Sequence, residues 1–171
     1  GKVWLVSYIG NFVGCLILSV IFVLAGASGT ADYYAGFIGN KLSIPAGEMF
    51  FRAILCNFFV CLAVACGMKC KNEVAKFFMI ILCIAGFVVA GFEHCVANMF
   101  YIPAGILASL NPAYVAKAEE AYGITAEQIA TLTPLHSLAN FIPVTLGNML
   151  GGMIFVGLPL YLIYKKNWEN K

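Results

Sequence analysis

Three polar side chains of different chemistry fall within six residues, inside the longest apolar stretch of the chain. Glu93, His94 and Asn98 supply a carboxylate, an imidazole and a carboxamide, and Gly91 stands just before them. Ionisable groups at membrane depth are costly and usually face a cavity or a partner, which makes them functional hypotheses. Irregular backbone is tolerated at that depth only where protein or water covers it. These residues therefore predict that 91–98 interrupts a membrane helix at the narrow point of a conduction pathway.

The imidazole of His94 is suited to donate and accept a proton on such a pathway. If residues 87–94 are helical, Phe87 shares a face with His94 and narrows the path in front of it. The alternative is a packed phenylalanine beside a hydrogen-bonded structural histidine. Desolvation disfavours the imidazolium, so we expect a neutral His94 that exchanges a proton with a passing weak acid. Glu93 points away from this face, and we expect it to hold the break structurally, together with Gly91 and Asn98.

Two neighbouring stretches supply further candidates. On the stretch 48–68, Asn57 and Val60 share a helical face, so Asn57 could hydrogen-bond His94 while Val60 narrows the path. The alternative is an ordinary contact of an asparagine between helices. Lys41, shortly before this stretch, would raise the local anion concentration if it lay in a vestibule. The alternative is an ordinary loop lysine.

The elements that must position these residues are membrane spans. Of 171 residues, 62% are hydrophobic and 11% are charged, and the mean hydropathy is +0.91. A soluble domain carries about 25% charged residues. Apolar stretches at 3–27, 48–68, 77–110 and 138–164 are each long enough to cross a bilayer. The sequence therefore predicts an all-α polytopic membrane protein in the lipid bilayer, with 77–110 divided into two half-helices.

The connections and the basic residues orient these spans. We expect a loop over 28–47 and a surface helix over 112–122. With both ends in the cytoplasm, seven of the ten basic residues lie on the cytoplasmic side, as the positive-inside rule favours. These are Lys2, Lys69, Lys71, Lys76, Lys165, Lys166 and Lys171, against Lys41, Arg52 and Lys117 on the other side.

An internal repeat suggests a two-fold design. The pattern G-N-x-x-G occurs at 10–14 in the first span and at 147–151 in the last, and these two spans run in opposite directions. Inverted-topology repeats with a central site on broken helices are common in transport proteins. The alternative is chance similarity between glycine-rich helices. If the repeat is real, two further spans precede Gly1, and the chain is about two-thirds of a pore-forming protomer.

Several function classes find no support in the residues. The chain has no basic face for a nucleic acid, no enzyme motif, no cofactor motif, and seven cysteines without metal-ligand spacing. A membrane thiol or sulfur enzyme would have to use Cys95 beside His94, but adjacent residues on a helix face different ways. A pore for water or glycerol would be expected to carry paired Asn-Pro-Ala motifs, and only 111–113 has one. We therefore expect a channel and no catalytic residues.

Four short sequence segments carry a resemblance to a known family. The first two are R-A-I-L-C-N at 52–57 and V-C-L-A at 60–63. They are followed by G-F-E-H-x-x-A-N-M-F at 91–100 and by N-x-I-P-V-T-x-G-N-x-x-G-G at 140–152. In order and spacing they resemble the formate/nitrite transporter family of pentameric anion channels, and within it the hydrosulfide channels most closely. The resemblance covers the whole chain.

The resemblance implies a fold and roles for single residues. The fold would be aquaporin-like, with six spans in two inverted repeats and a separate pore in each subunit of a homopentamer. His94 matches the central pore histidine, Asn57 its partner and Lys41 the vestibule lysine of the family. Phe87 and Val60 match constriction residues. The family's first two spans have no counterpart in this chain.

The expected function is therefore a channel for small monovalent anions of weak acids. The resemblance puts hydrosulfide first, with formate or nitrite as the alternative. Cofactors and metals are not expected. The expected location is a prokaryotic inner membrane, with several passes and a cytoplasmic C-terminus.

Overall fold

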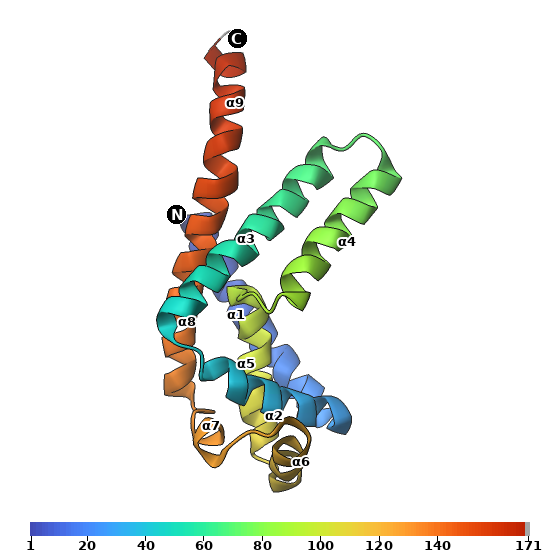
Figure 1. Ribbon diagram of the computed structural model, residues 1–171, viewed down its shortest axis with the longest axis vertical. Helices are drawn as coiled ribbons and strands as arrows, with labels where there is room; N and C mark the ends of the chain where they lie inside the picture. Colours follow the sequence, from blue (N-terminus) through green and yellow to red (C-terminus); the bar gives the residue numbers. More distant parts are fainter. Residues whose placement is uncertain (170–171) are drawn as a thin grey trace. The chain divides into compact units, whose positions relative to one another are not determined.

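The computed structural model describes residues 1–169, and this part of the chain is helical without a strand (Figure 1). Lys171, one of the basic residues counted above, lies outside the described residues. The helices are α1 (Lys2–Leu24), α2 (Ser28–Leu42), α3 (Ala46–Lys69), α4 (Glu73–Val89), α5 (Cys95–Ser109), α6 (Pro112–Tyr122), α7 (Ala126–Ala130), α8 (Pro134–Gly152), the π-helix η1 (Met153–Gly157) and α9 (Leu158–Glu169).

Three of these helical segments are long and apolar enough to cross a membrane. They are Lys2–Leu24, Ala46–Lys69 and the continuous run Pro134–Lys165. The pair α5 and α6, bent by 112°, counts as a fourth candidate. The stretch 77–110 is divided between α4 and α5, with a break over residues 90–94. The predicted all-α membrane architecture is confirmed. The helix is also broken as predicted, but the break covers residues 90–94 and not 91–98, because residues 95–98 already belong to α5.

The contacts group the chain into two compact units, each built from separate stretches. The first unit comprises Gly1–Pro45 and Cys95–Phe141, and the second comprises Ala46–His94 and the chain from Ile142 onward. The break therefore falls at the end of the first stretch of the second unit.

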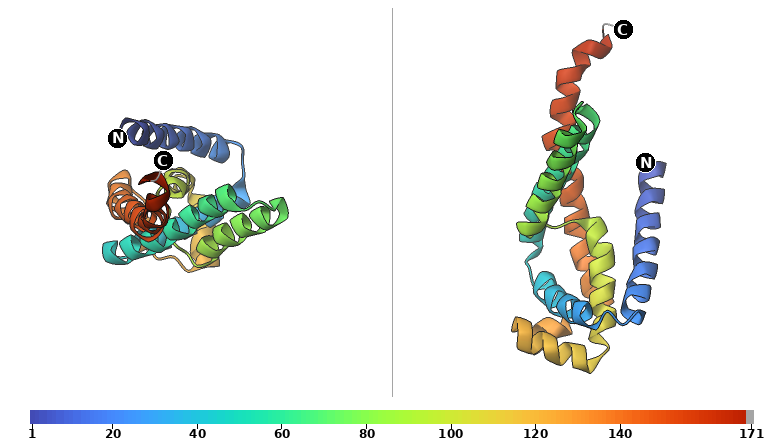
Figure 2. Two further views of the ribbon diagram at one scale, coloured as in Figure 1. Left: turned by 90° about the horizontal axis from the view of Figure 1, so that it is seen from above. Right: turned by 90° about the vertical axis from the view of Figure 1, so that its right-hand side faces the viewer.

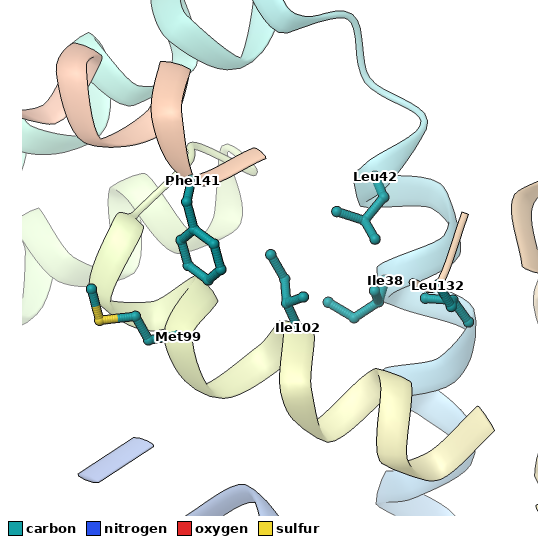
Figure 3. Close-up of a cluster of buried hydrophobic side chains, with 6 residues drawn as sticks. All are labelled: Ile38, Leu42, Met99, Ile102, Leu132 and Phe141. Atoms are coloured by element: carbon teal, nitrogen blue, oxygen red, sulfur yellow. The ribbon is translucent and has the colours of Figure 1, made fainter. Parts of the chain in front are cut away.

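In the first unit, α1 and α5 lie side by side (Figure 2). The buried Ser19 on α1 joins them, because its hydroxyl donates to the carbonyl oxygens of Cys15 at 2.7 Å and Phe100 at 3.0 Å. An apolar cluster packs α2 against α5 (Figure 3). Its buried members are Ile38, Leu42, Met99, Ile102, Leu132 and Phe141.

The predicted loop over 28–47 is wrong, because α2 occupies most of it. Gly, Ser, Asp and Asn lower the helix propensity of this stretch. Four apolar residues at helical spacing, Ala31, Ala35, Ile38 and Leu42, are nevertheless all buried. Burying such a face against a neighbour stabilises a helix more than propensity does. The tertiary packing of α2 therefore outweighs its composition.

The predicted surface helix over 112–122 is confirmed as α6. Asn111 is its N-cap, with the side-chain oxygen accepting from the N–H of Ala113 at 3.0 Å, and Pro112 takes the first helical position. The Asn-Pro-Ala triplet is thus a helix start. Lys117 on α6 pairs with the buried carboxylate of Asp32 on α2 at 3.3 Å.

The second unit contains a hairpin of α3 and α4, which run side by side (Figure 1). Asn72 caps α4 by accepting from the N–H of Ala75 at 3.0 Å. The later part of α8 packs closely against α3: a methyl group at Gly151 would lie 2.9 Å from the carbonyl carbon of Ile54. Only a glycine lets the two backbones approach this closely.

The helix that follows α8 widens into the π-helix η1 before α9 begins. Leu158 donates its N–H to the carbonyl oxygen of Met153, five residues earlier. Pro159 follows directly, and a proline in an α-helix clashes with the carbonyl group four residues before it. The wider turn lets the chain accommodate Pro159 and remain helical.

Candidate functional site: the helix break before α5

The end of α4 is a Schellman motif, which reverses the chain in two residues. The N–H of Gly91 donates to the carbonyl oxygen of Val88 at 3.1 Å, and that of Phe92 donates to Phe87 at 3.0 Å. This motif needs a left-handed residue after the last helical one, and Gly91 has φ = +66°. A side chain is disfavoured at such an angle. Gly91, which precedes the polar residues in the sequence, therefore ends α4.

Two side chains from α3 and α8 tie down the carbonyl groups of the break. Nη1 of Arg52 donates to Gly91 at 3.3 Å, and Nδ2 of the buried Asn148 donates to Glu93 at 2.9 Å. The same Nδ2 donates to the carbonyl oxygen of Ala53 on α3 at 2.8 Å. Asn148 thus uses both of its donor positions on main-chain groups. The break is held by the helices packed around it.

Sequence reasoning missed Asn148 as a site residue, although it had noted the residue in the G-N-x-x-G repeat. The available signal was a carboxamide beside two glycines in an apolar span. A polar side chain in such a place must find a partner. Which carbonyl groups it reaches depends on the packing of α8 against α3.

His94 and Phe87 lie against each other at the break. Their ring centres are 5.8 Å apart with planes tilted by 36°, and both side chains are half-buried. The shared face of Phe87 and His94 was conditional on a helix over 87–94, and that condition is not met, since residues 90–94 are not helical. The turn at Gly91 brings the two rings together instead.

The two candidates on α3 lie one turn apart, and both are half-buried. Nδ2 of Asn57 donates a hydrogen bond to the main-chain oxygen of Asn148. Asn57 thus joins the same network from its other end. A hydrogen bond from Asn57 to His94 and a narrowing role for Val60 stay predictions.

Lys41 is in the last turn of α2 and is buried. Its Nζ lies 5.1 Å from the centre of the Phe37 ring, within reach of a cation–π interaction. The position also suits a cation, because the C-terminal end of a helix is negative. Lys41 is therefore a packed helix residue and not a loop lysine, and it belongs to the first unit.

Glu93 and Asn98 are both buried. Glu93 is 1% exposed, and its main-chain oxygen is the one that Asn148 binds. Asn98 is on α5 and donates through Nδ2 to Oδ1 of Asn140 on α8 at 2.8 Å. The first turn of α5 starts directly after His94, so the positive end of that helix lies at the break.

Within residues 1–169, no group of three or more His, Cys, Asp and Glu side chains could hold a metal ion. The seven cysteines are all free thiols. At the end of its first stretch, the second unit presents an imidazole and a phenyl ring in contact. An imidazole can both donate and accept a proton.

Comparison with known proteins assigns the chain to a family. The family model described as formate/nitrite transporter matches residues 1–162. The chain belongs to the formate/nitrite transporter family. It is 38% identical to the formate channel FocA of Haemophilus influenzae, over 91% of this chain and 56% of that protein. It is 36% identical to FocA of Escherichia coli K12, over 99% of this chain and 61% of that protein.

Solved structures of the formate/nitrite transporter family match as well. One, described as a pentameric formate channel with formate bound, gives a TM-score of 0.79 at 36% identity and covers 94% of this chain and 65% of that chain. A second, described as an ion channel of the family, gives 0.69 at 27% identity. The chain spans little more than half the length of the curated relatives it matches, consistent with about four of six spans.

Proposed function

We propose that this chain is part of a channel for small monovalent anions of weak acids, and that formate is its first substrate. The observation that carries this is the family membership, joined to a histidine presented at a helix break. Two of the named relatives are formate channels, and a matching solved structure is described with formate bound. The sequence motifs alone had put hydrosulfide first. The names of these relatives support formate instead.

The physical problem for such a channel is to move an anion through an apolar constriction. Stripping a bare ion of water costs about 20 kcal/mol in the idealised limit. A weak acid avoids this by crossing in its neutral form. We assign attraction of the anion to Lys41 and to the positive end of α5. His94 then relays a proton: one ring nitrogen takes a proton from water while the other gives its N–H to the anion, directly or through water, so that the imidazole stays neutral overall. Phe87 and Val60 form the constriction.

The structural residues keep this pathway in place. Gly91 ends α4, and we assign Glu93 and Asn98 to holding the break. Asn57 binds the same network through Asn148. This division separates residues that meet the substrate from those that position them.

Formate uptake into liposomes by the full-length protein tests the mechanism. We expect His94→Phe to lower uptake by about tenfold or more, equivalent to about 1.4 kcal/mol of barrier. The remaining uptake should follow only the concentration of neutral acid in bulk solution. Lys41→Ala should weaken uptake most at low formate concentration, because it removes an attracting charge.

Matched variants control for general damage. His136→Phe alters the other histidine, which is exposed beside Thr133, and Lys71→Ala removes an exposed lysine. Both should behave as the unaltered protein. Undiminished, pH-independent uptake in His94→Phe and Lys41→Ala would refute the mechanism.

The substrate, assembly and orientation are part of the same proposal. Side-by-side uptake of formate, nitrite, hydrosulfide and chloride ranks the anions, and we expect formate to lead and chloride to fail. We propose a homopentamer in a prokaryotic inner membrane with a cytoplasmic C-terminus. The mass of the purified assembly and the accessibility of a C-terminal tag test these two points.

A further inference from the structure

Arg52 reaches the helix break through a contact that the proposed mechanism does not use. Nε and Nη2 of its guanidinium donate to Oε1 of Glu48, one turn earlier on α3, with Nε at 2.9 Å. From the other edge, Nη1 donates to the carbonyl oxygen of Gly91 at 3.3 Å. Glu48 therefore orients the guanidinium so that its free edge meets the break.

The orientation of the Gly91 carbonyl affects the backbone of the break. This carbonyl belongs to the left-handed residue that turns the backbone, three residues before His94. It also lies at the C-terminal end of α4, where the helix dipole is negative. A guanidinium there fixes the peptide and offsets a charge that would repel an anion at the break.

The geometry points to Arg52 as a positioning residue for the channel. Through Gly91 it sets the path of residues 91–94 and hence the place of the His94 imidazole, while Asn148 holds the Glu93 carbonyl from α8. A lysine cannot replace it, because only the planar guanidinium offers donors on two edges in fixed geometry. The transport readout of this inference rests on the proposed function, whereas the labelling readout below does not.

The test uses Arg52→Gln and Arg52→Lys in the full-length protein, with Lys76→Gln as the matched control. Lys76 forms an ion pair with Glu73 at 2.7 Å on the first turn of α4, away from the break. Formate uptake is measured against pH and expressed per reconstituted protein. We expect formate uptake to fall by about tenfold or more in both Arg52 variants and its pH profile to shift, because the group that exchanges the proton is displaced. Lys76→Gln should change neither.

The second readout does not depend on any substrate. Cys95 directly follows His94 and is only 9% exposed. Its labelling by N-ethylmaleimide, measured on peptides by mass spectrometry, reports loosening of the break. We expect labelling of Cys95 to rise several-fold in both Arg52 variants and to stay unchanged in Lys76→Gln.

Two results would overturn the assignment. One is an Arg52→Lys variant with the uptake, pH profile and Cys95 labelling of the unaltered protein. The other is an Arg52→Gln variant that leaves the labelling and the pH profile unchanged. If Arg52→Gln does not assemble, Arg52→Lys alone decides, since it keeps the charge. If the unaltered protein carries no formate, the proposed function fails while the labelling still tests Arg52.

Discussion

Gly151→Ala is the substitution whose consequence follows most directly from the packing of α8 on α3. The added methyl group would lie 2.9 Å from the carbonyl carbon of Ile54 and 3.0 Å from its Cα, and nearer still to its carbonyl oxygen. Carbon atoms in good contact are about 3.5–4.0 Å apart, so the helices must separate by about 0.6–1 Å. Main-chain atoms cannot rotate away as a flexible side chain does.

The same movement disturbs the break. Asn148 lies one turn before Gly151, and its bonds of 2.8 Å and 2.9 Å to Ala53 and Glu93 would lengthen to about 3.4 Å or more, beyond the usual range. The two bonds contribute about 0.5–1.5 kcal/mol each, and overpacking costs about 1–3 kcal/mol. Alanine recovers about 1 kcal/mol in helix propensity. The expected net loss is about 1–5 kcal/mol.

Thermal unfolding of the full-length protein in detergent measures this loss, which should lower the Tm by several degrees. Formate uptake per folded protein should fall as well. The control is Gly67→Ala on α3, where the methyl group meets only the end of the Ile80 side chain at 3.4 Å. That variant should be as stable as the unaltered protein or slightly more so. A Gly151→Ala variant with unchanged Tm and uptake would refute the reasoning.

Two further substitutions separate stability from function at the break. Gly91→Ala places a side chain at φ = +66° and should cost about 1–2 kcal/mol. The control is Gly123→Ala, at φ = +61° in open space, which should cost a similar free energy of unfolding and leave the pH profile of uptake unchanged. Identical pH profiles in the two variants would contradict a role of Gly91 at the break. Asn148→Asp exchanges a donor to two carbonyl groups for an acceptor and should abolish stable folding or uptake. Asn72→Asp should be silent, because the side-chain oxygen of Asn72 already accepts; a tolerated Asn148→Asp would mean that the amide bonds are dispensable.

Much of the fold could be predicted from residue types alone. Apolar length predicts the spans, because a bilayer sets a fixed distance to cross. A glycine followed by Glu93, His94 and Asn98 predicts the break, since polar groups and a left-handed residue end an apolar helix. These inferences need no neighbours, because they depend only on local chemistry and on the membrane as solvent.

Other features depended on which helices meet. Composition predicted a loop at 28–47, and the burial of one face made it α2. In the G-N-x-x-G repeat, Gly151 and Asn148 occupy the same positions as Gly14 and Asn11. Only the packing on α3 shows that Gly151 is in close contact, while Gly14 has nothing within 4 Å.

Hydrogen-bond partners were the least predictable part of the site. Asn148, Arg52 and Asn57 reach main-chain oxygens on other segments, 39 to 95 residues away in the chain. A carbonyl group looks the same at every position of a sequence, so residue types do not say which one a side chain will meet. The sequence alone established the chemistry of the break and where it occurs, whereas the side chains that hold it follow from the distance between packed helices.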